Sequence, residues 1–181
     1  YLCLYPGDDS GEPRLVFTWL DFVRYEAVQS QVRTGNLSAE KVKCVAWDLD
    51  NTLWRGILSE QDQLVPNEDA IRVIKSLDER GILQTIDSKN DHDPAWEALV
   101  RLGISDYFLF PAINWGQKSE NLRQIASHLN IGLDSFAVID DSMFERNEIK
   151  TSIPEARVYP ETDINTLLFQ NEFDVPITEL S

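Results

Sequence analysis

Two acidic side chains stand two residues apart, directly after a short apolar run. The run covers residues 44–47, and Asp48 and Asp50 follow it, with Asn51 and Thr52 beside them. An apolar run of this length is typical of a strand buried on both faces, so both carboxylates would lie at the end of one central strand. Carboxylates held together repel each other, and a divalent cation removes that conflict because hard ions bind oxygen ligands. The spacing therefore predicts a metal site at this strand end.

More polar side chains follow other predicted strands. Ser88 comes after a predicted strand at residues 82–86, Asp140 and Asp141 follow another, and Lys118 opens a predicted helix. In an open parallel sheet the ligand crevice lies outside the carboxyl ends of the strands, so these groups would meet at one rim. A phosphoryl group needs positive charge and hydrogen-bond donors around its oxygens. The set therefore indicates a phosphate site beside the metal site.

Apolar runs alternate with helical patterns along the part of the chain that must position these groups. The predicted strands are residues 43–47, 82–86, 107–110, 136–139 and 156–159. The predicted helices are residues 67–80, 93–103, 118–130, 144–150 and 163–170. Strands that alternate with helices predict an α/β fold, here a Rossmann-like three-layer sandwich with a mainly parallel central sheet. Residues 53–66 have no helical period and fit a hairpin or flap over the first strand end.

These residues resemble the motifs of the haloacid dehalogenase (HAD) superfamily of aspartate-nucleophile phosphatases and phosphotransferases. The first motif of that family, Asp-x-Asp-x-Thr/Val, is matched by residues 48–52. The longer match Asp-Leu-Asp-Asn-Thr-Leu-Trp, with Ser-Lys-Asn-Asp at 88–91 and Asp-Asp-Ser-Met-Phe-Glu-Arg at 140–146, resembles more narrowly the FkbH-like branch. This resemblance covers roughly residues 43–159.

The resemblance implies roles for the acidic residues. Asp48 would be the nucleophile that forms an aspartyl-phosphate. Asp50 would protonate the leaving oxygen and later activate water, and we expect crowding beside other acids to help it hold that proton. Mg²⁺ would be held by Asp48, by the backbone carbonyl of Asp50 and by the pair Asp140 and Asp141. One acid of that pair would bind the ion directly and the other a bound water, with Asp140 preferred as the direct ligand.

The same resemblance implies which residues contact the phosphate. Ser88 would donate a hydrogen bond to a phosphoryl oxygen, and Lys118 would offset the charge of both Asp48 and the phosphate. The full set expected to bind substrate is Asn51, Thr52, Ser88, Lys89, Asn90 and Lys118.

Relatives of the FkbH-like branch are implicated in taking 1,3-bisphosphoglycerate, removing its phosphate and loading a glyceryl unit onto an acyl carrier protein for polyketide pathways. The resemblance thus implies two partners, a phosphorylated small molecule and a carrier protein. Asp87 departs from expectation, because a charge directly before Ser88 should weaken phosphate binding unless it points away. Carrier proteins are acidic and this chain has a formal charge of -15. It would therefore need a local basic patch, for which Arg55, Lys89 and Arg146 are the candidates.

The spacing of the motifs leaves no room for a large cap domain. Only a short segment separates Thr52 from the next predicted helix, and residues 88–118 hold one helix and one strand. An uncapped rim excludes water poorly around a small substrate. Such a site suits a phosphate presented by something large, or closure by another domain.

Length and composition agree with one domain and short extensions. The chain has 181 residues, 43% of them hydrophobic, which is enough for a well-packed core. We expect residues 1–40 to form a linker and a helix at 18–34 against a neighbouring domain of the same polypeptide, 41–171 to form the phosphatase domain, and 172–181 a tail. The acidic balance argues against nucleic-acid and membrane partners. Because no leader or membrane span is apparent, we expect a cytoplasmic protein.

Three other functions fit parts of the pattern. A stand-alone capless phosphatase of phosphoproteins or phosphosugars would use the same residues. A phosphate-binding or interaction module could keep the fold without turnover, although the complete set of acids, serine and lysine favours an enzyme. A receiver domain of two-component signalling also uses acids, a hydroxyl and lysine around Mg²⁺, but its paired acids precede the phosphorylated aspartate, whereas Asp140 and Asp141 come last here.

Overall fold

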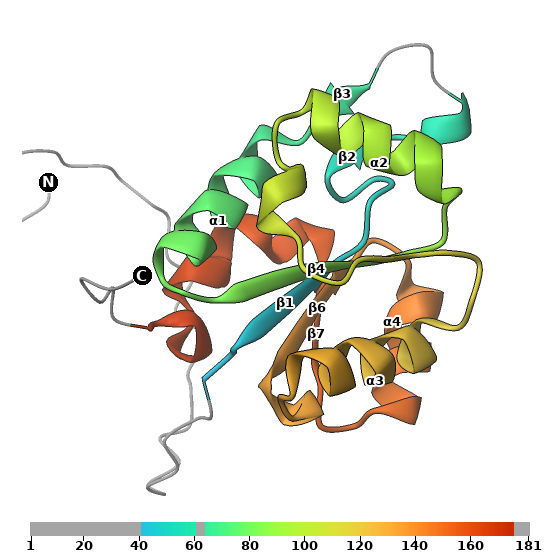
Figure 1. The fold of residues 1–181 in the computed structure, drawn as a ribbon. Helices are drawn as coiled ribbons and strands as arrows, with labels where there is room; N and C mark the ends of the chain where they lie inside the picture. Colours follow the sequence, from blue (N-terminus) through green and yellow to red (C-terminus); the bar gives the residue numbers. More distant parts are fainter. Residues whose placement is uncertain (1–40, 61–63, 176–181) are drawn as a thin grey trace, which may run out of the picture. The chain divides into compact units, whose positions relative to one another are not determined.

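A five-stranded parallel sheet forms the centre of the protein, in the strand order β5-β4-β1-β6-β7 (Figure 1). The computed structural model describes residues 41–60 and 64–175. The strands of this sheet are β1 (Cys44–Trp47), β4 (Leu83–Ser88), β5 (Ala112–Ile113), β6 (Phe136–Asp140) and β7 (Arg157–Pro160). The predicted α/β fold with a mainly parallel sheet is confirmed.

Helices cover both faces of the sheet, as Figure 1 shows, with α1 and α2 on one side and α3 and α4 on the other. Their bounds are α1 (Glu68–Glu79), α2 (His92–Arg101), α3 (Lys118–Leu129) and α4 (Met143–Ser152). Side chains of a strand point alternately to the two faces. In β1, Val45 and Trp47 accordingly join one buried cluster, while Cys44 and Ala46 join the other. This strand is buried on both faces, as its apolar run predicts.

Local signals place α1 and α4. The Asn67 side chain accepts a hydrogen bond from the backbone N–H of Ala70 and caps α1, and the Ser142 side chain caps α4 in the same way. Gly81 ends the α1 region with a φ of 71°, a left-handed conformation that glycine adopts without a steric penalty.

A two-stranded hairpin lies between β1 and α1. Strand β2 (Trp54–Arg55) pairs antiparallel with β3 (Val65–Pro66), and a short 3₁₀ helix, η1 (Leu58–Glu60), lies between them. The predicted flap is thus present. Residues 41–60 and 64–175 contain no inserted domain that could serve as a large cap.

The structure corrects two predicted elements. The strand predicted at residues 107–110 is wrong: η2 (Ser105–Tyr107) is a 3₁₀ helix, and the edge strand β5 starts later. The aromatic residues at 107–110 have the composition of a strand. Residues two apart in a strand lie on the same face, but Phe108 is buried while Phe110 is exposed. The closing helix predicted at 163–170 is the 3₁₀ helix η4 (Glu161–Phe169).

The C-terminal part of the core extends past residue 171, where we expected the domain to end. A 3₁₀ turn, η5 (Asn171–Phe173), follows η4, and the Phe173 side chain is fully buried. The backbone N–H of Val42 donates to the carbonyl of Glu172 (2.9 Å), which ties the two ends of the described domain together. The helix predicted at residues 18–34 lies outside the described residues.

Within the described ranges, no helix combines the length and the apolar character needed to cross a bilayer.

Candidate active site

A cavity of about 290 Å³ opens at the carboxyl ends of β1, β4 and β6. Eight of the ten predicted site residues line it: Asp48, Asp50, Ser88, Lys89, Asn90, Lys118, Asp140 and Asp141. These residues come from four separate stretches of the chain, and the parallel sheet brings them to one rim.

A buried lysine forms the floor of the cavity. Lys118 Nζ lies 2.7 Å from Asp48 Oδ1 and also contacts Asp140 Oδ2. All three residues are buried. Burial by itself would lower the pKa of Lys118, but the two carboxylates outweigh it and raise the pKa, so the lysine stays protonated. Burial raises the pKa of Asp48 to about 6, against the opposing effect of the Lys118 ammonium.

Three acidic side chains could hold a metal ion beside this floor. Ligand oxygens of Asp48, Asp140 and Asp141 all lie within 4.8 Å of one another. Asp140 Oδ1 accepts a hydrogen bond from the backbone N–H of Ser142 (2.8 Å), and Asp141 Oδ2 accepts one from Asn51 Nδ2 (3.1 Å). A set of carboxylate oxygens at this spacing fits Mg²⁺, a hard cation. The cluster contains no side-chain oxygen of Asp50, for which the family resemblance implied a role of the backbone carbonyl.

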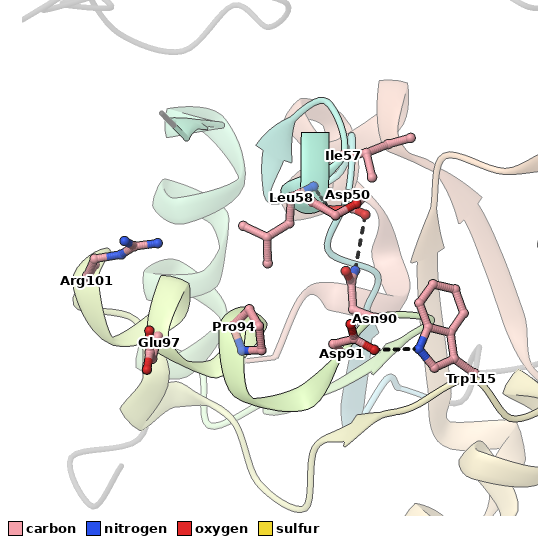
Figure 2. Close-up of a pocket in the computed structure, with 10 residues that line it drawn as sticks. Asp50, Ile57, Leu58, Asn90, Asp91, Pro94, Glu97, Arg101 and Trp115 are labelled. Carbon is pink, nitrogen blue, oxygen red and sulfur yellow. Dashed lines mark hydrogen bonds between the residues drawn. The ribbon is translucent and has the colours of Figure 1, made fainter. Parts of the chain in front are cut away.

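Asp50 is held by the hairpin and not by other acids. Its Oδ1 accepts hydrogen bonds from Trp54 Nε1 (2.7 Å) and from the backbone N–H of Leu58 (3.0 Å). Its Oδ2 accepts one from Asn90 Nδ2 (3.2 Å), which Figure 2 shows as a dashed line. All three of these hydrogen bonds come from N–H donors, and none comes from another acid. These donors fix the direction in which the carboxyl points.

Residues after β4 supply polar groups to the opposite wall. Asn90 Nδ2 also donates to Ser88 Oγ (3.3 Å), so one amide links the serine to Asp50. Lys89 Nζ pairs with Glu145 Oε1 (2.9 Å) across the cavity and stays partly exposed. Arg146, a second cation of the predicted basic patch, donates to the carbonyl of Asp140 and lies 3.9 Å from Glu161. Both cations are therefore partnered with acids or backbone of this chain.

Asn51 and Thr52 do not line the cavity. Asn51 has a φ of 55°, and its side chain accepts from the backbone N–H of Gly56 (2.9 Å) while donating to Asp141. Thr52 is fully buried, and its hydroxyl has no partner within the described residues. Both shape the turn after β1, so the geometry gives them no direct contact with a substrate in this cavity.

Asp87 points away from the site. It lines neither this cavity nor the second, adjoining cavity described below. Its Oδ1 accepts a hydrogen bond from Asn121 Nδ2 (2.9 Å) in the interior. Burial raises its pKa to about 8, so the side chain is mostly protonated and neutral at pH 7. A neutral Asp87 carboxyl does not repel a bound phosphate.

Several residues at the site were not predicted from the sequence. Ile57, Trp115 and Ser142 line the cavity, and Trp54 positions Asp50 from a fully buried location. Trp54 stands four residues after Asp50, and its buried N–H needs an acceptor, a signal that could have been used. Trp115 lies in a loop whose path follows from the tertiary structure, so the sequence held no equivalent signal for it.

Comparisons with known proteins agree with this geometry. No protein-family model and no curated protein matches the chain. Among solved structures, the N-terminal part of protein BF1531 from Bacteroides fragilis, containing a phosphatase domain complexed with Mg, is 29% identical with a TM-score of 0.65. That match covers 75% of this chain and 41% of the other, so the chain spans less than half of that relative.

Two more distant structures share the fold. A putative HAD superfamily (subfamily III A) hydrolase from Legionella pneumophila is 16% identical, with a TM-score of 0.56 over 76% of this chain and 85% of that one. The cobalt-bound deoxy-D-mannose-octulosonate 8-phosphate phosphatase from Haemophilus influenzae is 16% identical, with a TM-score of 0.52 over 68% and 71%.

The shared fold and the gathering of Asp48, Lys118 and Asp140 at one strand rim lead to the same assignment. Its solved structural neighbours are HAD-superfamily phosphatases, and the chain shares their fold.

Proposed function

We propose that this chain is a Mg²⁺-dependent phosphatase or phosphotransferase that works through an aspartyl-phosphate on Asp48. One observation carries the proposal. The ammonium of Lys118, from α3, is buried between two carboxylates that end two different strands, directly beside an open cavity. Charged side chains are rarely buried unless they are paired or functional, because their removal from water costs free energy. Here the arrangement places positive charge and an acidic nucleophile where a phosphate would enter.

The residues divide the reaction between them. A carboxylate oxygen of Asp48 attacks phosphorus, the bond from phosphorus to the leaving oxygen breaks, and Asp50 gives that oxygen a proton. In the second half, Asp50 takes a proton from water, whose oxygen attacks phosphorus and releases phosphate while Asp48 is restored. Lys118 stays protonated and offsets negative charge throughout. Ser88 donates a hydrogen bond to a phosphoryl oxygen, and Asn90, whose amide binds both Asp50 and Ser88, orients these two side chains.

A divalent ion fits the same site. Asp48, Asp140 and Asp141 offer the oxygens that would hold Mg²⁺, with Asp140 as the preferred direct ligand. When bound there, Mg²⁺ would supply positive charge that offsets the charge of the phosphate group.

The finer proposal is that this domain acts in an FkbH-like system, on units derived from 1,3-bisphosphoglycerate that are loaded onto an acyl carrier protein. The Asp-Leu-Asp-Asn-Thr-Leu-Trp match and the open rim without a large cap support it. The partnering of Lys89 and Arg146 with acids of this chain favours the alternative, a stand-alone capless phosphatase of phosphoproteins or phosphosugars. Copurification with a phosphopantetheinylated carrier protein would separate the two.

The decisive experiment measures phosphate release from acetyl phosphate and an aryl phosphate, with and without Mg²⁺, for the wild type and Asp48→Asn. We expect metal-dependent turnover in the wild type and none in the variant, which keeps the shape of the side chain but loses the nucleophile. Turnover that persists in Asp48→Asn would exclude the aspartyl-phosphate. Absence of turnover in the wild type would favour a binding module.

A further inference from the structure

A second cavity of about 350 Å³ adjoins the proposed catalytic cavity. The two share four lining residues: Asp50, Ile57, Asn90 and Trp115. The second cavity is lined by Asp50 but not by Asp48, so a compound whose phosphate lies against Asp48 would extend past Asp50 into it. This placement rests on the proposed function, because it takes Asp50 as the acid that protonates the leaving oxygen.

One face of α2 forms a long wall of this second cavity. The lining residues recur at near-helical spacing from the N-cap to the last residue of the helix. They are Asp91, Pro94, Glu97 and Arg101. With a rise of 1.5 Å per residue, that wall is about 15 Å long. Figure 2 shows Arg101 on the side of the cavity away from Asp50 and Trp115, with Leu58 and Pro94 between them. The cavity is thus elongated, and it leads away from the proposed chemistry.

The two ends of this cavity differ in chemistry. Near Asp50, the indole of Trp115 is held by a hydrogen bond from its Nε1 to Asp91 Oδ1 (2.9 Å), drawn as a dashed line in Figure 2. Along the middle, Leu58 and Pro94 provide apolar surface. At the far end, the Arg101 guanidinium is exposed and has no recorded ion pair within residues 41–60 and 64–175. Glu97, one turn earlier on the same helix, lowers the positive potential there without cancelling it.

We infer that the second cavity holds the organic part of the substrate, an extended chain with an anionic group at its far end that pairs with Arg101. The apolar middle suits the carbon chain, and the guanidinium suits a carboxylate or phosphate oxygen pair. A three-carbon phosphate is too short to reach from Asp50 to the end of α2, so a substrate that fills this cavity fits the alternative of a capless phosphatase and not units derived from 1,3-bisphosphoglycerate. The substrate class is therefore a phosphomonoester of a long, narrow, acid-terminated compound.

Binding of non-hydrolysable phosphonates tests this assignment independently of turnover. Calorimetry in the presence of Mg²⁺ would compare propyl phosphonate, nonyl phosphonate and nonyl phosphonate with a terminal carboxylate. We expect the nonyl compound to bind more tightly than the propyl one. The terminal carboxylate should add a further factor of about 2 to 5, as an ion pair at an exposed guanidinium would.

Three variants assign the effect to residues. Arg101→Gln should remove the gain from the carboxylate, whereas Lys75→Gln, which removes an exposed cation from α1, should keep it. Glu97→Gln should increase the gain, because it removes a competing negative charge. Trp115→Ala should weaken both nonyl compounds alike.

Equal affinity for the propyl and nonyl compounds, or a carboxylate gain that survives Arg101→Gln, would overturn the inference. Failure of the proposed function would appear separately, as an absence of phosphate release from the aryl phosphate. Phosphonate binding that follows the expected pattern would support the cavity assignment in that case too.

Discussion

Asp48 and Asp50 are two residues apart, yet they lie in opposite surroundings. Asp48 is buried and contacts Lys118, which is 70 residues away in the chain. Asp50 is partly exposed and takes two of its three hydrogen bonds from Trp54 and Leu58, within eight residues of it. The first environment is made by the sheet topology, and the second is made largely by a local hairpin.

This contrast separates two tasks that a phosphate site must perform. In the floor of the cavity, the buried ammonium of Lys118 balances the carboxylates of Asp48 and Asp140. Removal of any one of these side chains therefore leaves a buried charge unpaired. The hairpin around Asp50 orients its carboxyl through neutral N–H donors. Removal of one donor therefore misorients the carboxyl but leaves no buried charge without a partner. Substitutions in the two regions should therefore differ in how they divide between stability and activity.

The largest expected effect comes from the floor. Lys118→Met would leave the Asp48 and Asp140 carboxylates buried without their cation. We expect the free energy of unfolding to fall by about 3 to 5 kcal/mol without Mg²⁺, the usual cost of breaking a buried pair. Phosphate release should fall about 1,000-fold, since the charge that faces the phosphate is lost. Urea unfolding and a phosphate-release assay would measure the two.

Added Mg²⁺ sharpens this prediction. It should restore more stability in Lys118→Met than in the wild type, because the two carboxylates then have a cation again. Lys75→Met, at an exposed position on α1, is the control and should change neither quantity appreciably. Equal stability of Lys118→Met and the wild type without Mg²⁺ would contradict the interdependence of the floor.

A smaller effect is expected at the hairpin. Trp54→Phe removes the indole N–H that Asp50 accepts at 2.7 Å and keeps most of the buried ring. We expect kcat to fall about 10-fold, because the acid is no longer held toward the leaving oxygen. Steady-state kinetics with an aryl phosphate would measure this.

Trp47→Phe is a matched control for that substitution. Trp47 is also fully buried, and it donates its indole N–H to Gln84 Oε1 (3.1 Å) on the neighbouring strand. Both variants should lose about 1 to 2 kcal/mol of stability, since each leaves a side-chain acceptor without its donor. Only Trp54→Phe should lower kcat. A similar fall in kcat for both variants would mean that weakened packing, and not the lost hydrogen bond to Asp50, causes the effect.

The same contrast explains how far the sequence could predict the site. The floor was predictable because short apolar runs that end in Asp48, Ser88 and Asp140 identify strand ends, and parallel strand ends share a rim. The contacts of Asp50 were not, because the hairpin that surrounds it has only two residues in each strand and no clear periodicity.

Other differences come from tertiary packing. The aromatic residues at 107–110 have the composition of a strand, but the chain passes the sheet edge there, and the backbone N–H of Leu109 donates to Gln84 (2.8 Å) before β5 begins. Phe173 enters the core although the segment around it is acidic and short. In both places, contacts with distant residues outweigh the local pattern.

The smallest effect on phosphate release is expected at Asp87, which is buried and lines neither cavity. Burial raises its pKa to about 8, well above the value of an exposed aspartate, so the folded state holds a proton that the unfolded state releases. Stability from this group is therefore fully present below the unfolded pKa and declines as pH rises toward 8. We expect a slope of at most about 1.4 kcal/mol per pH unit between those values.

Asp87→Asn should remove that part of the slope, because its amide does not titrate. Urea unfolding at a series of pH values from 5 to 8 would compare the two proteins, with Asp78→Asn on the exposed surface of α1 as the control that keeps the wild-type slope. Parallel curves for the wild type and Asp87→Asn would mean that this carboxyl is already ionised in the folded state. Its charge would then lie beneath Lys118 as a third acid of the floor, and the separation between floor and interior argued above would fail.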